Sequence, residues 1–168
     1  MNNRYAGIIE NDVVNGEGIC VSFFVQGCRH HCPGCFNPET WDFNGGKPLP
    51  ANYKEQIYSA LVKNGIKRNL SILGGDPLEP ENQELVEDLI IWVKEKLPDI
   101  KIYLWTGSRL CDLLSQNNTV VNSILNKIDF LIDGPFIKEL KDLTLSLRGS
   151  KNQNIWRKTK KGFWYLLP

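Results

Sequence analysis

The feature that most constrains this chain is a set of four short, almost unbroken apolar runs rich in β-branched and aromatic residues. They occupy residues 19–25, 70–73, 102–105 and 128–132. Runs of this length are typical of strands that are buried on both faces, as in parallel sheets. The sequence therefore predicts four strands at the centre of a sheet.

Patterns with helical spacing lie between these runs. Apolar residues recur every three or four positions at 57–62, at 85–97 ahead of Pro98, and at 110–125 with an interruption near Asn117 and Asn118. Two further stretches, 5–10 and 163–167, predict flanking strands. The alternation of strands and helices favours an α/β fold with a mainly parallel sheet and right-handed crossovers.

The length of the chain limits the architecture. At 168 residues it suits one domain but is too short for a complete eightfold βα barrel, which usually needs about 250 residues. We predict a single domain over residues 1–168, with an open sheet or a partial (incomplete) βα barrel and the helices on its outer face. No internal repeat, low-complexity tract or linker divides the sequence.

Each of the four runs is followed by residues typical of turns or of ligand contact. A cysteine cluster follows the first run, Gly74-Gly75-Asp76-Pro77 the second, Thr106-Gly107 the third and Asp133-Gly134-Pro135 the fourth. Because ligands bind at the carboxyl ends of strands in parallel α/β sheets, these segments predict one shared site. For Gly107 and Gly134 taken alone, a structural role in a turn is favoured.

The cysteines indicate the chemistry of that site. The sequence has five cysteines, and Cys28, Cys32 and Cys35 lie within eight residues of one another. An odd number, in a chain whose N-terminus leads into no apolar stretch of signal-peptide length, argues against a disulfide framework. Thiolates this close can converge on one soft metal centre.

The cluster lacks an obvious fourth ligand, which structural zinc and a conventional four-iron cluster both require. Cys20 lies on the first predicted strand, roughly 26 Å from Cys28 in an extended chain, and Cys111 is expected to be a packed core thiol on a helix. His30 or His31 could complete a zinc site, although adjacent histidines in a loop are more often solvated or bound to a neighbouring group. The remaining option is three thiolates that hold three irons and leave one iron open to a small molecule.

The spacing of the three cysteines, after the first strand of an α/β half-barrel, resembles that of the radical S-adenosylmethionine superfamily. Further segments resemble, in family order, the activating proteins of anaerobic (class III) ribonucleoside-triphosphate reductases. They run from residue 15 to residue 153 and comprise Asn15-Gly16-Glu17-Gly18, Phe24-Val25-Gln26-Gly27-Cys28, Pro33-Gly34-Cys35-Phe36-Asn37-Pro38-Glu39-Thr40-Trp41, Gly74-Gly75-Asp76-Pro77-Leu78, Leu104-Trp105-Thr106-Gly107, Ile132-Asp133-Gly134-Pro135-Phe136 and Arg148-Gly149-Ser150-Lys151-Asn152-Gln153.

The resemblance implies a radical S-adenosylmethionine domain in which Cys28, Cys32 and Cys35 hold a 4Fe-4S cluster. The fourth iron would bind the amino and carboxylate groups of S-adenosylmethionine, and reductive cleavage would release methionine and a 5′-deoxyadenosyl radical. That radical would take a hydrogen from a backbone glycine near the C-terminus of the large reductase subunit and leave a stable glycyl radical. An electron donor such as a flavodoxin would reduce the cluster.

The resemblance also implies contacts with S-adenosylmethionine at the strand ends. Gly74 and Gly75 would approach the methionine end closely, and their carbonyls would accept hydrogen bonds from its ammonium group. Asp76 would add a charge-assisted contact to that ammonium. Thr106 and Gly107 would line the same cleft.

Two residues beside the last cysteine complete the implied cofactor site. Gly34 and Phe36 flank Cys35, where the family places nucleoside contacts, and the Phe36 ring offers a face for adenine. Many superfamily members carry an aromatic residue at the position of Gly34 and a glutamate at that of Asp76. Both residues of this chain match the narrower family.

Composition bounds the location and the partners. Twenty Lys and Arg against nineteen Asp and Glu give a net charge of +1, which indicates no polyanionic partner. The longest apolar run, residues 89–93, is far shorter than the roughly 20 residues that span a bilayer. We therefore expect a cytoplasmic protein with no membrane partner and no nucleic-acid partner.

The C-terminal stretch after Asp142 is basic and aromatic. It has no acidic residue, and it interleaves six basic residues with four aromatic ones: Arg148, Lys151, Arg157, Lys158, Lys160 and Lys161 with Trp156, Phe163, Trp164 and Tyr165. It could be a solvated hairpin with a packed aromatic face, a docking site for an acidic patch of the reductase, or a site for single-stranded nucleic acid. The alternatives for the whole chain are an activase of another glycyl radical enzyme, a small deazapurine-type radical enzyme, and a zinc-bearing nucleic-acid-binding module.

Overall fold

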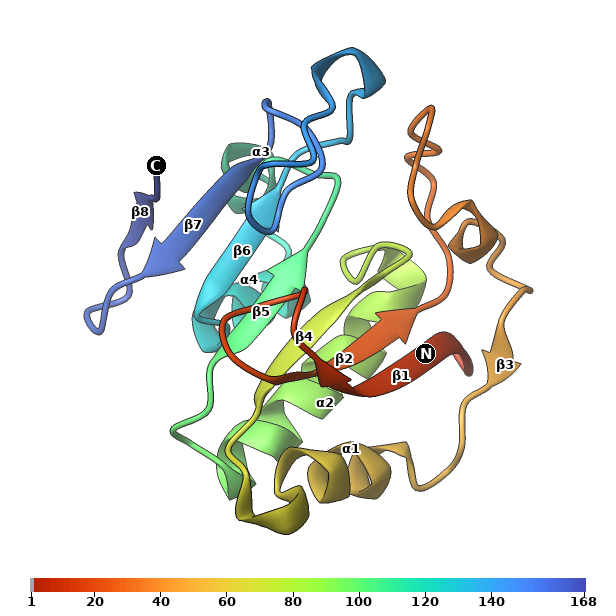
Figure 1. The fold of residues 1–168 in the computed structure, drawn as a ribbon, viewed down its shortest axis with the longest axis vertical. Helices are drawn as coiled ribbons and strands as arrows, with labels where there is room; N and C mark the ends of the chain where they lie inside the picture. Colours follow the sequence, from red (N-terminus) through yellow and green to blue (C-terminus); the bar gives the residue numbers. More distant parts are fainter. Residues whose placement is uncertain (1) are drawn as a thin grey trace.

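The computed structural model describes residues 2–168, and all the strands of this part of the chain lie in one sheet (Figure 1). The strands are β1 (Arg4–Asp12), β2 (Cys20–Val25), β3 (Lys47–Pro48), β4 (Asn69–Gly74), β5 (Ile102–Trp105), β6 (Phe130–Asp133), β7 (Asn154–Lys158) and β8 (Trp164–Leu166). The helices are α1 (Tyr53–Leu61), α2 (Pro80–Lys96), α3 (Leu110–Ser115) and α4 (Thr119–Lys127), with short 3-10 helices η1 (Pro38–Thr40), η2 (Lys63–Gly65) and η3 (Lys138–Leu140). The strand order is β3-β1-β2-β4-β5-β6-β7-β8.

The four apolar runs form the central strands, as predicted. β2, β4, β5 and β6 are neighbours, pair in parallel and are buried along most of their length. Val25 at the end of β2 lies opposite Gly74 at the end of β4, so the segments that follow these two strands begin side by side at the carboxyl ends of the strands. This register brings the cysteine segment beside the glycines that follow β4.

The sheet is mixed, and the prediction of a mainly parallel sheet is wrong. Of the seven strand pairings among residues 2–168, three are parallel and four are antiparallel. The antiparallel pairs lie at the two edges, where the β1–β2 and β7–β8 connections are too short for the crossover that parallel strands need. The sheet stays open from β3 to β8, and the predicted partial βα barrel is not confirmed.

Alternate residues of the central strands face different clusters of side chains. On β5, Ile102 and Leu104 belong to the main core, together with helix residues such as Leu89 of α2. Tyr103 points to the opposite face and stacks on Phe130 with 4.4 Å between the ring centroids. The helices α1, α2 and α4 therefore pack on one face of the sheet through the main core (Figure 1).

The helices occur where the periodicity predicts them. α2 ends just before Pro98, which disfavours helix at the preceding residue. The predicted interruption separates α3 from α4: Asn117 has a left-handed φ of +50°, and the Asn118 side chain caps α4 by accepting from the Val120 and Val121 amides, both at 3.0 Å. No helix within residues 2–168 combines the length and the apolar character needed to cross a membrane.

Two cysteines outside the cluster have different surroundings. Cys20 is buried on the sheet, as predicted, at the start of β2. Cys111 is exposed, so the prediction of a packed core thiol is wrong. α3 buries Leu110 and Leu113, whereas Leu114 is 50% exposed and does not form the core contact that the prediction assumed.

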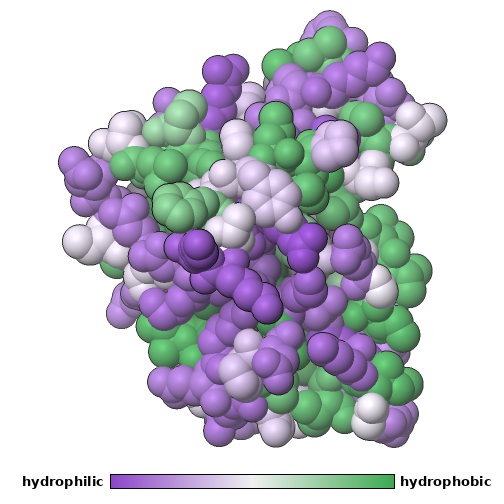
Figure 2. Space-filling model, turned by 90° about the vertical axis from the view of Figure 1, so that its left-hand side faces the viewer, coloured by the Kyte–Doolittle hydropathy of each residue, from purple (hydrophilic) through white to green (hydrophobic). Residues whose placement is uncertain are grey.

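The basic, aromatic C-terminal stretch forms the β7–β8 hairpin at one edge of the sheet (Figure 1). Trp156 and Trp164 pack partly against the main core, while Phe163 and Leu166 are exposed. Figure 2, which looks at the left-hand side of Figure 1, shows hydrophilic and apolar side chains intermixed on this side. The arrangement agrees with the hairpin interpretation of this stretch.

Candidate functional site

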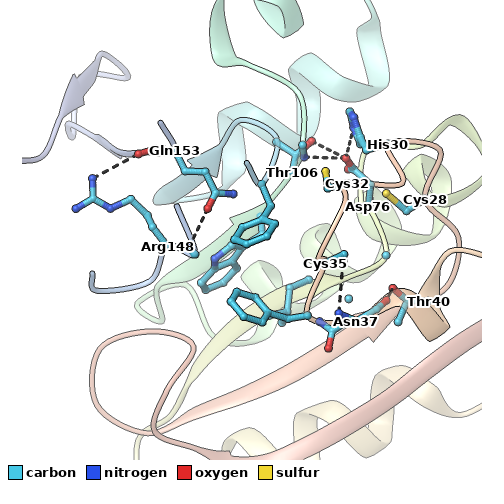
Figure 3. A pocket seen from close by; sticks show the side chains of 18 of the residues that line it. Cys28, His30, Cys32, Cys35, Asn37, Thr40, Asp76, Thr106, Arg148 and Gln153 are labelled. Atoms are coloured by element: carbon cyan, nitrogen blue, oxygen red, sulfur yellow. Dashed lines mark hydrogen bonds and ion pairs between the residues drawn. The ribbon is translucent and has the colours of Figure 1, made fainter. Parts of the chain in front are cut away.

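A cavity of about 490 Å³ lies at the carboxyl ends of the central strands (Figure 3). Cys28, Cys32 and Cys35, from the segment after β2, line it. Residues that follow β4, β5 and β6 line it as well: Gly74, Gly75, Asp76, Thr106, Gly107 and Gly134. The structure thus brings the segments after all four central strands to one cavity.

Gly34 and Asp133 are predicted residues that lie outside the cavity lining. Gly34 has a left-handed φ of +77° and belongs to a turn in which the Cys35 amide donates to the Cys32 carbonyl at 3.0 Å. Asp133 is buried, and its Oδ2 accepts from the Leu110 amide at 2.7 Å. Gly34 therefore shapes the turn between two cysteines, and Asp133 holds the start of α3.

The three thiols of the cluster are half-buried and form no disulfide. Burial raises the pKa of Cys28 to about 12, and burial also raises the pKa of Cys32. These two thiols are therefore protonated near neutral pH, and a metal would have to displace their protons on binding. The Asn37 amide lies 3.4 Å from Cys35 Sγ, a contact of the kind that tunes cluster sulfurs.

No fourth cysteine lines the cavity with these three. Within residues 2–168, Cys20 lies at the opposite end of β2 and Cys111 lies on the exposed surface of α3. Zinc held by the three thiols would need one more side chain beside them. Among residues 2–168, no group of three His, Cys, Asp or Glu side chains lies close enough together to bind a single metal ion. A four-iron cluster spreads its thiolates over separate irons, and three thiols around one cavity fit that arrangement.

The two histidines between the cysteines have other partners, as expected for a histidine pair in a loop. His30 Nε2 lies 2.9 Å from Asp76 Oδ2. The His31 ring stacks on Trp41 with 4.6 Å between the ring centroids. The His30 contact joins the cysteine segment to the end of β4, whereas the His31 contact stays within the connection between β2 and β3.

Asp76 is buried beside the cavity, and both of its oxygens accept hydrogen bonds from the protein (Figure 3). Oδ1 accepts from the Leu78 amide at 2.9 Å. Oδ2 accepts from the Thr106 hydroxyl and the Gly107 amide, both at 3.0 Å, and also faces His30. Asp76 therefore connects the cysteine segment to the ends of β4 and β5.

Two glycines at the strand ends leave room for the cysteine segment. A Cβ on Gly75 would lie 2.4 Å from the Gly27 carbonyl oxygen, and a Cβ on Gly107 would lie 2.6 Å from the His30 ring. A Cβ on Gly75 would require the backbone to shift, and one on Gly107 would displace the His30 ring. Close packing of the cysteine segment thus accounts for Gly75 and Gly107 before any ligand is considered.

Polar contacts that the sequence did not predict also hold the cysteine segment. The Arg29 amide donates to Glu79 Oε1 at 2.6 Å, and the Arg29 guanidinium pairs with Glu79 and with Glu81 at the start of α2. The buried Gln26 side chain donates to two carbonyls of the segment 39–42 at 3.0 and 2.7 Å. The only feature of the sequence that could have indicated this role of Gln26 is its place as a polar residue directly after an apolar strand.

Phe36 forms part of the wall next to Cys35. It lines the cavity and is 56% exposed. Its ring centroid lies 5.2 Å from that of Phe136, and the Lys141 ammonium lies 5.4 Å above it. A Cβ on Gly149 would lie 2.7 Å from the Phe36 ring, so this glycine lets the ring pack closely.

The segment 148–153 forms a folded turn at the far wall of the cavity. Gln153 Oε1 accepts from the Gly149 and Ser150 amides at 2.9 and 3.1 Å, and its Nε2 donates to the Gly134 carbonyl at 3.0 Å. The Arg148 side chain extends away from the cysteines and reaches the Gln153 carbonyl at 3.4 Å (Figure 3). The hydrogen bonds of Gln153 therefore hold this turn, and with it the far wall of the cavity, in place.

The chain belongs to a class of iron–sulfur proteins: a family model described as a 4Fe-4S single cluster domain matches residues 14–156. An anaerobic ribonucleoside-triphosphate reductase-activating protein of Pasteurella multocida is 40% identical over 158 residues, which are 94% of this chain and 99% of that protein. Proteins of the same name from Escherichia coli K12 and Enterobacteria phage T4 are 40% and 39% identical, over 86% and 96% of this chain and 92% and 97% of their own lengths. The chain belongs to the family of anaerobic ribonucleoside-triphosphate reductase-activating proteins.

Proposed function

We propose that this protein activates an anaerobic ribonucleoside-triphosphate reductase by radical S-adenosylmethionine chemistry, as a single domain over residues 1–168. One observation carries the proposal: three thiols line one cavity, and no fourth cysteine within residues 2–168 lines it with them. Cys28, Cys32 and Cys35 would hold a 4Fe-4S cluster and leave one iron for S-adenosylmethionine. When bound, the reduced cluster would supply an electron, and S-adenosylmethionine would supply a 5′-deoxyadenosyl radical with release of methionine; this radical would take a hydrogen atom from a reductase glycine.

The strand ends would hold the methionine end of S-adenosylmethionine. Gly74 and Gly75 line the cavity, and their carbonyls would accept hydrogen bonds from the ammonium group. Asp76 would contribute negative charge to the same wall. Because Asp76 already accepts hydrogen bonds from Thr106 and Gly107, it would also fix the position of these two residues of the wall.

The wall beside Cys35 would hold the nucleoside. Phe36 lines the cavity and offers its ring to adenine. Gly34 lies outside the lining, and we propose that it supports the nucleoside site through the turn between Cys32 and Cys35. The walls of this cavity would keep water away from the reacting atoms and hold them in contact.

The names of the relatives support the reductase as partner, ahead of another glycyl radical enzyme or a small deazapurine-type substrate. The match to a 4Fe-4S domain supports iron ahead of the zinc-bearing nucleic-acid module. The hydrogen would come from a glycine near the C-terminus of the large reductase subunit. The electron would come from a donor such as a flavodoxin.

Anaerobic reconstitution with iron and sulfide tests the proposal. We expect a brown protein with about four irons per chain, which after reduction converts S-adenosylmethionine to methionine and 5′-deoxyadenosine. Mixing it with the reductase should give the electron paramagnetic resonance signal of a glycine-centred radical. Cys111→Ala is the matched control for Cys35→Ala, because Cys111 is a free cysteine outside the cavity lining.

A colourless protein that holds one zinc ion per chain would contradict the cluster assignment. A brown protein that leaves S-adenosylmethionine intact after reduction would contradict the radical chemistry. Cleavage without a glycine-centred radical on the reductase would contradict the choice of partner alone.

A further inference from the structure

One of the three residues between Cys28 and Cys32 has a position different from that of its neighbours. Only His30 lines the cavity, whereas Arg29 and His31 do not. The His30 side chain is 30% exposed, and its Nε2 lies 2.9 Å from a buried carboxylate oxygen. This contact fixes the orientation of the His30 ring.

We propose that His30 is a positioning residue, which fixes the cysteine loop against the ends of β4 and β5 so that cluster and S-adenosylmethionine meet in one geometry. The proposal rests on the proposed function, since it concerns the same cavity. His30 itself need not touch the cluster or S-adenosylmethionine. It acts through Asp76 on one side and through the loop between Cys28 and Cys32 on the other.

The first argument is the shared acceptor. Asp76 Oδ2 faces His30 Nε2 at 2.9 Å and accepts from the Thr106 hydroxyl and the Gly107 amide, both at 3.0 Å (Figure 3). One oxygen thus joins the cysteine loop to the segment after β5. Loss of the His30 donor would remove the contact between the loop and Asp76, and would also change how Asp76 holds Thr106 and Gly107. Removal of such an outer-shell partner typically costs 10–100-fold in affinity or activity.

The second argument is steric. The His30 ring occupies the space where Gly107 has no side chain, because a Cβ there would lie 2.6 Å from the His30 Cδ2 atom. An alanine at this position would push the ring away and remove no polar group. The new Cβ would also lie 2.8 Å from His30 Nε2, so Gly107→Ala displaces the ring and its contact with Asp76 while every polar group of the cavity stays present.

The experiment measures the binding of S-adenosylmethionine to anaerobically reconstituted full-length protein by equilibrium dialysis, together with iron content. We expect His30→Ala and His30→Phe to hold about four irons per chain and to bind S-adenosylmethionine about tenfold more weakly. The change that S-adenosylmethionine causes in the resonance spectrum of the reduced cluster should also differ from that of the wild type. His30→Gln retains an N–H donor and should stay within about threefold of wild-type affinity.

His31→Asn is the matched control. His31 lies in the same loop, stacks on Trp41 and does not line the cavity, and its left-handed φ of +45° suits asparagine. Its affinity and its spectrum should match those of the wild type. A loss equal to that of His30→Ala would show that any change in the loop has this effect, and would overturn the specific role of His30.

A double-variant cycle separates a positioning role from direct contact. Gly107→Ala should weaken binding about as much as His30→Ala does, and in the His30→Ala background it should cost nothing more. If the two losses multiply instead, Gly107 acts independently of His30 and the proposal is wrong. If His30→Ala does not fold or hold iron, Gly107→Ala alone decides, and wild-type affinity and spectrum in Gly107→Ala overturn the proposal.

The outcomes also separate this inference from the proposed function. Wild-type protein that binds no S-adenosylmethionine contradicts both. Wild-type protein that binds it, with His30→Ala and His30→Phe equal to the wild type in affinity and spectrum, contradicts the positioning role alone.

Discussion

Arg29 and Glu79 form a double contact in which one carboxylate accepts from both the backbone and the side chain of the same residue. The Arg29 amide donates to Glu79 Oε1 at 2.6 Å, and the Arg29 guanidinium donates to Glu79 Oε2 at 2.7 Å. Glu79 is buried just ahead of α2, while Arg29 directly follows the first cysteine of the cluster. The contact therefore fixes the start of the cysteine loop to a helix.

We expect Glu79→Ala to lower the free energy of unfolding of the cluster-free protein by about 1–3 kcal/mol, because the Arg29 amide loses its buried acceptor. Urea denaturation measures this change. Glu81→Gln is the control, since the contact of Glu81 with Arg29 is exposed and such pairs contribute little. Equal effects of the two variants would contradict the role given to the buried amide contact.

Gly75→Ala should lower stability by about 1–3 kcal/mol and reduce iron uptake. The new methyl group would lie 2.4 Å from the Gly27 carbonyl oxygen, a backbone atom, so the cysteine loop would have to move. Gly7→Ala is a control within the sheet, because nothing lies within 4 Å of a Cβ there. The check is iron content and urea denaturation of both variants; wild-type iron uptake by Gly75→Ala would count against the packing argument.

Asp12 should make stability depend on pH in the acidic range. Burial opposes its ionisation, but hydrogen bonds from Ser22, Val14 and Asn15 outweigh burial and lower the pKa of Asp12 below its usual 3.8. A lowered folded-state pKa contributes stability above the unfolded value and loses it as pH falls through the folded value. Asp12 thus anchors a loop whose residues Val14 and Asn15 line the cavity.

The measurement compares the wild type with Asp12→Asn by urea denaturation at pH 6 and again below pH 3.8. The wild type should have the higher free energy of unfolding at pH 6, and the difference between the two proteins should shrink as the pH falls. A difference that stays constant over this range would mean that the Asp12 carboxylate is not the titrating group.

Lys158 should make stability depend on pH in the alkaline range. Burial lowers the pKa of Lys158 to about 8, against the opposing charge of Asp129 and with a further contribution from the nearby Lys94 and Lys127. The unfolded chain keeps its proton up to about 10.5, so the stability cost of this partly buried ammonium is complete at neutral pH and declines as pH rises from 8 to 10.5. The wild type should therefore gain stability relative to Lys158→Met between pH 7 and pH 10, and a difference independent of pH would refute this.

Residue periodicity carried enough information to place the central strands. Residues such as Val21, Leu70 and Leu131 lie in runs that are buried on both faces, and burial on both faces leaves an unbroken apolar signal. β7 gave no such signal, because Ile155 is its one buried residue and the charged residues Arg157 and Lys158 follow it in the strand. The outer strands also made the sheet mixed, and no local pattern of apolar residues indicates the direction in which such strands pair.

The site could be predicted in its chemistry but not in its supporting contacts. The cysteine spacing and the strand-end glycines are local features of the sequence. The pairs His30–Asp76 and Arg29–Glu79 join residues that lie far apart in the chain, and neither has a periodic pattern. The predicted burial of Cys111 was wrong because it relied on Leu114 of the same short helix, and Leu114 is itself 50% exposed.

The ligand assignment makes a separate prediction for each cysteine. Cys28→Ala, Cys32→Ala and Cys35→Ala should each lose most of the cluster, because under the proposed assignment each thiolate would hold one iron. Cys20→Ala and Cys111→Ala should keep iron content and activity, since neither side chain lines the cavity. Iron and sulfide analysis of the five variants checks this, and a loss of the cluster in Cys111→Ala would contradict the assignment.

The central claim is that three thiolates of this chain leave one iron free for S-adenosylmethionine. Electron–nuclear double resonance on the reduced, anaerobic protein tests it most directly, with S-adenosylmethionine isotopically labelled at its amino nitrogen. The account predicts a coupling between the labelled nitrogen and the cluster, which the different coupling of ordinary nitrogen replaces when the label is omitted. A cluster that shows no coupling to the label, or that couples to a histidine nitrogen of the chain instead, would contradict it.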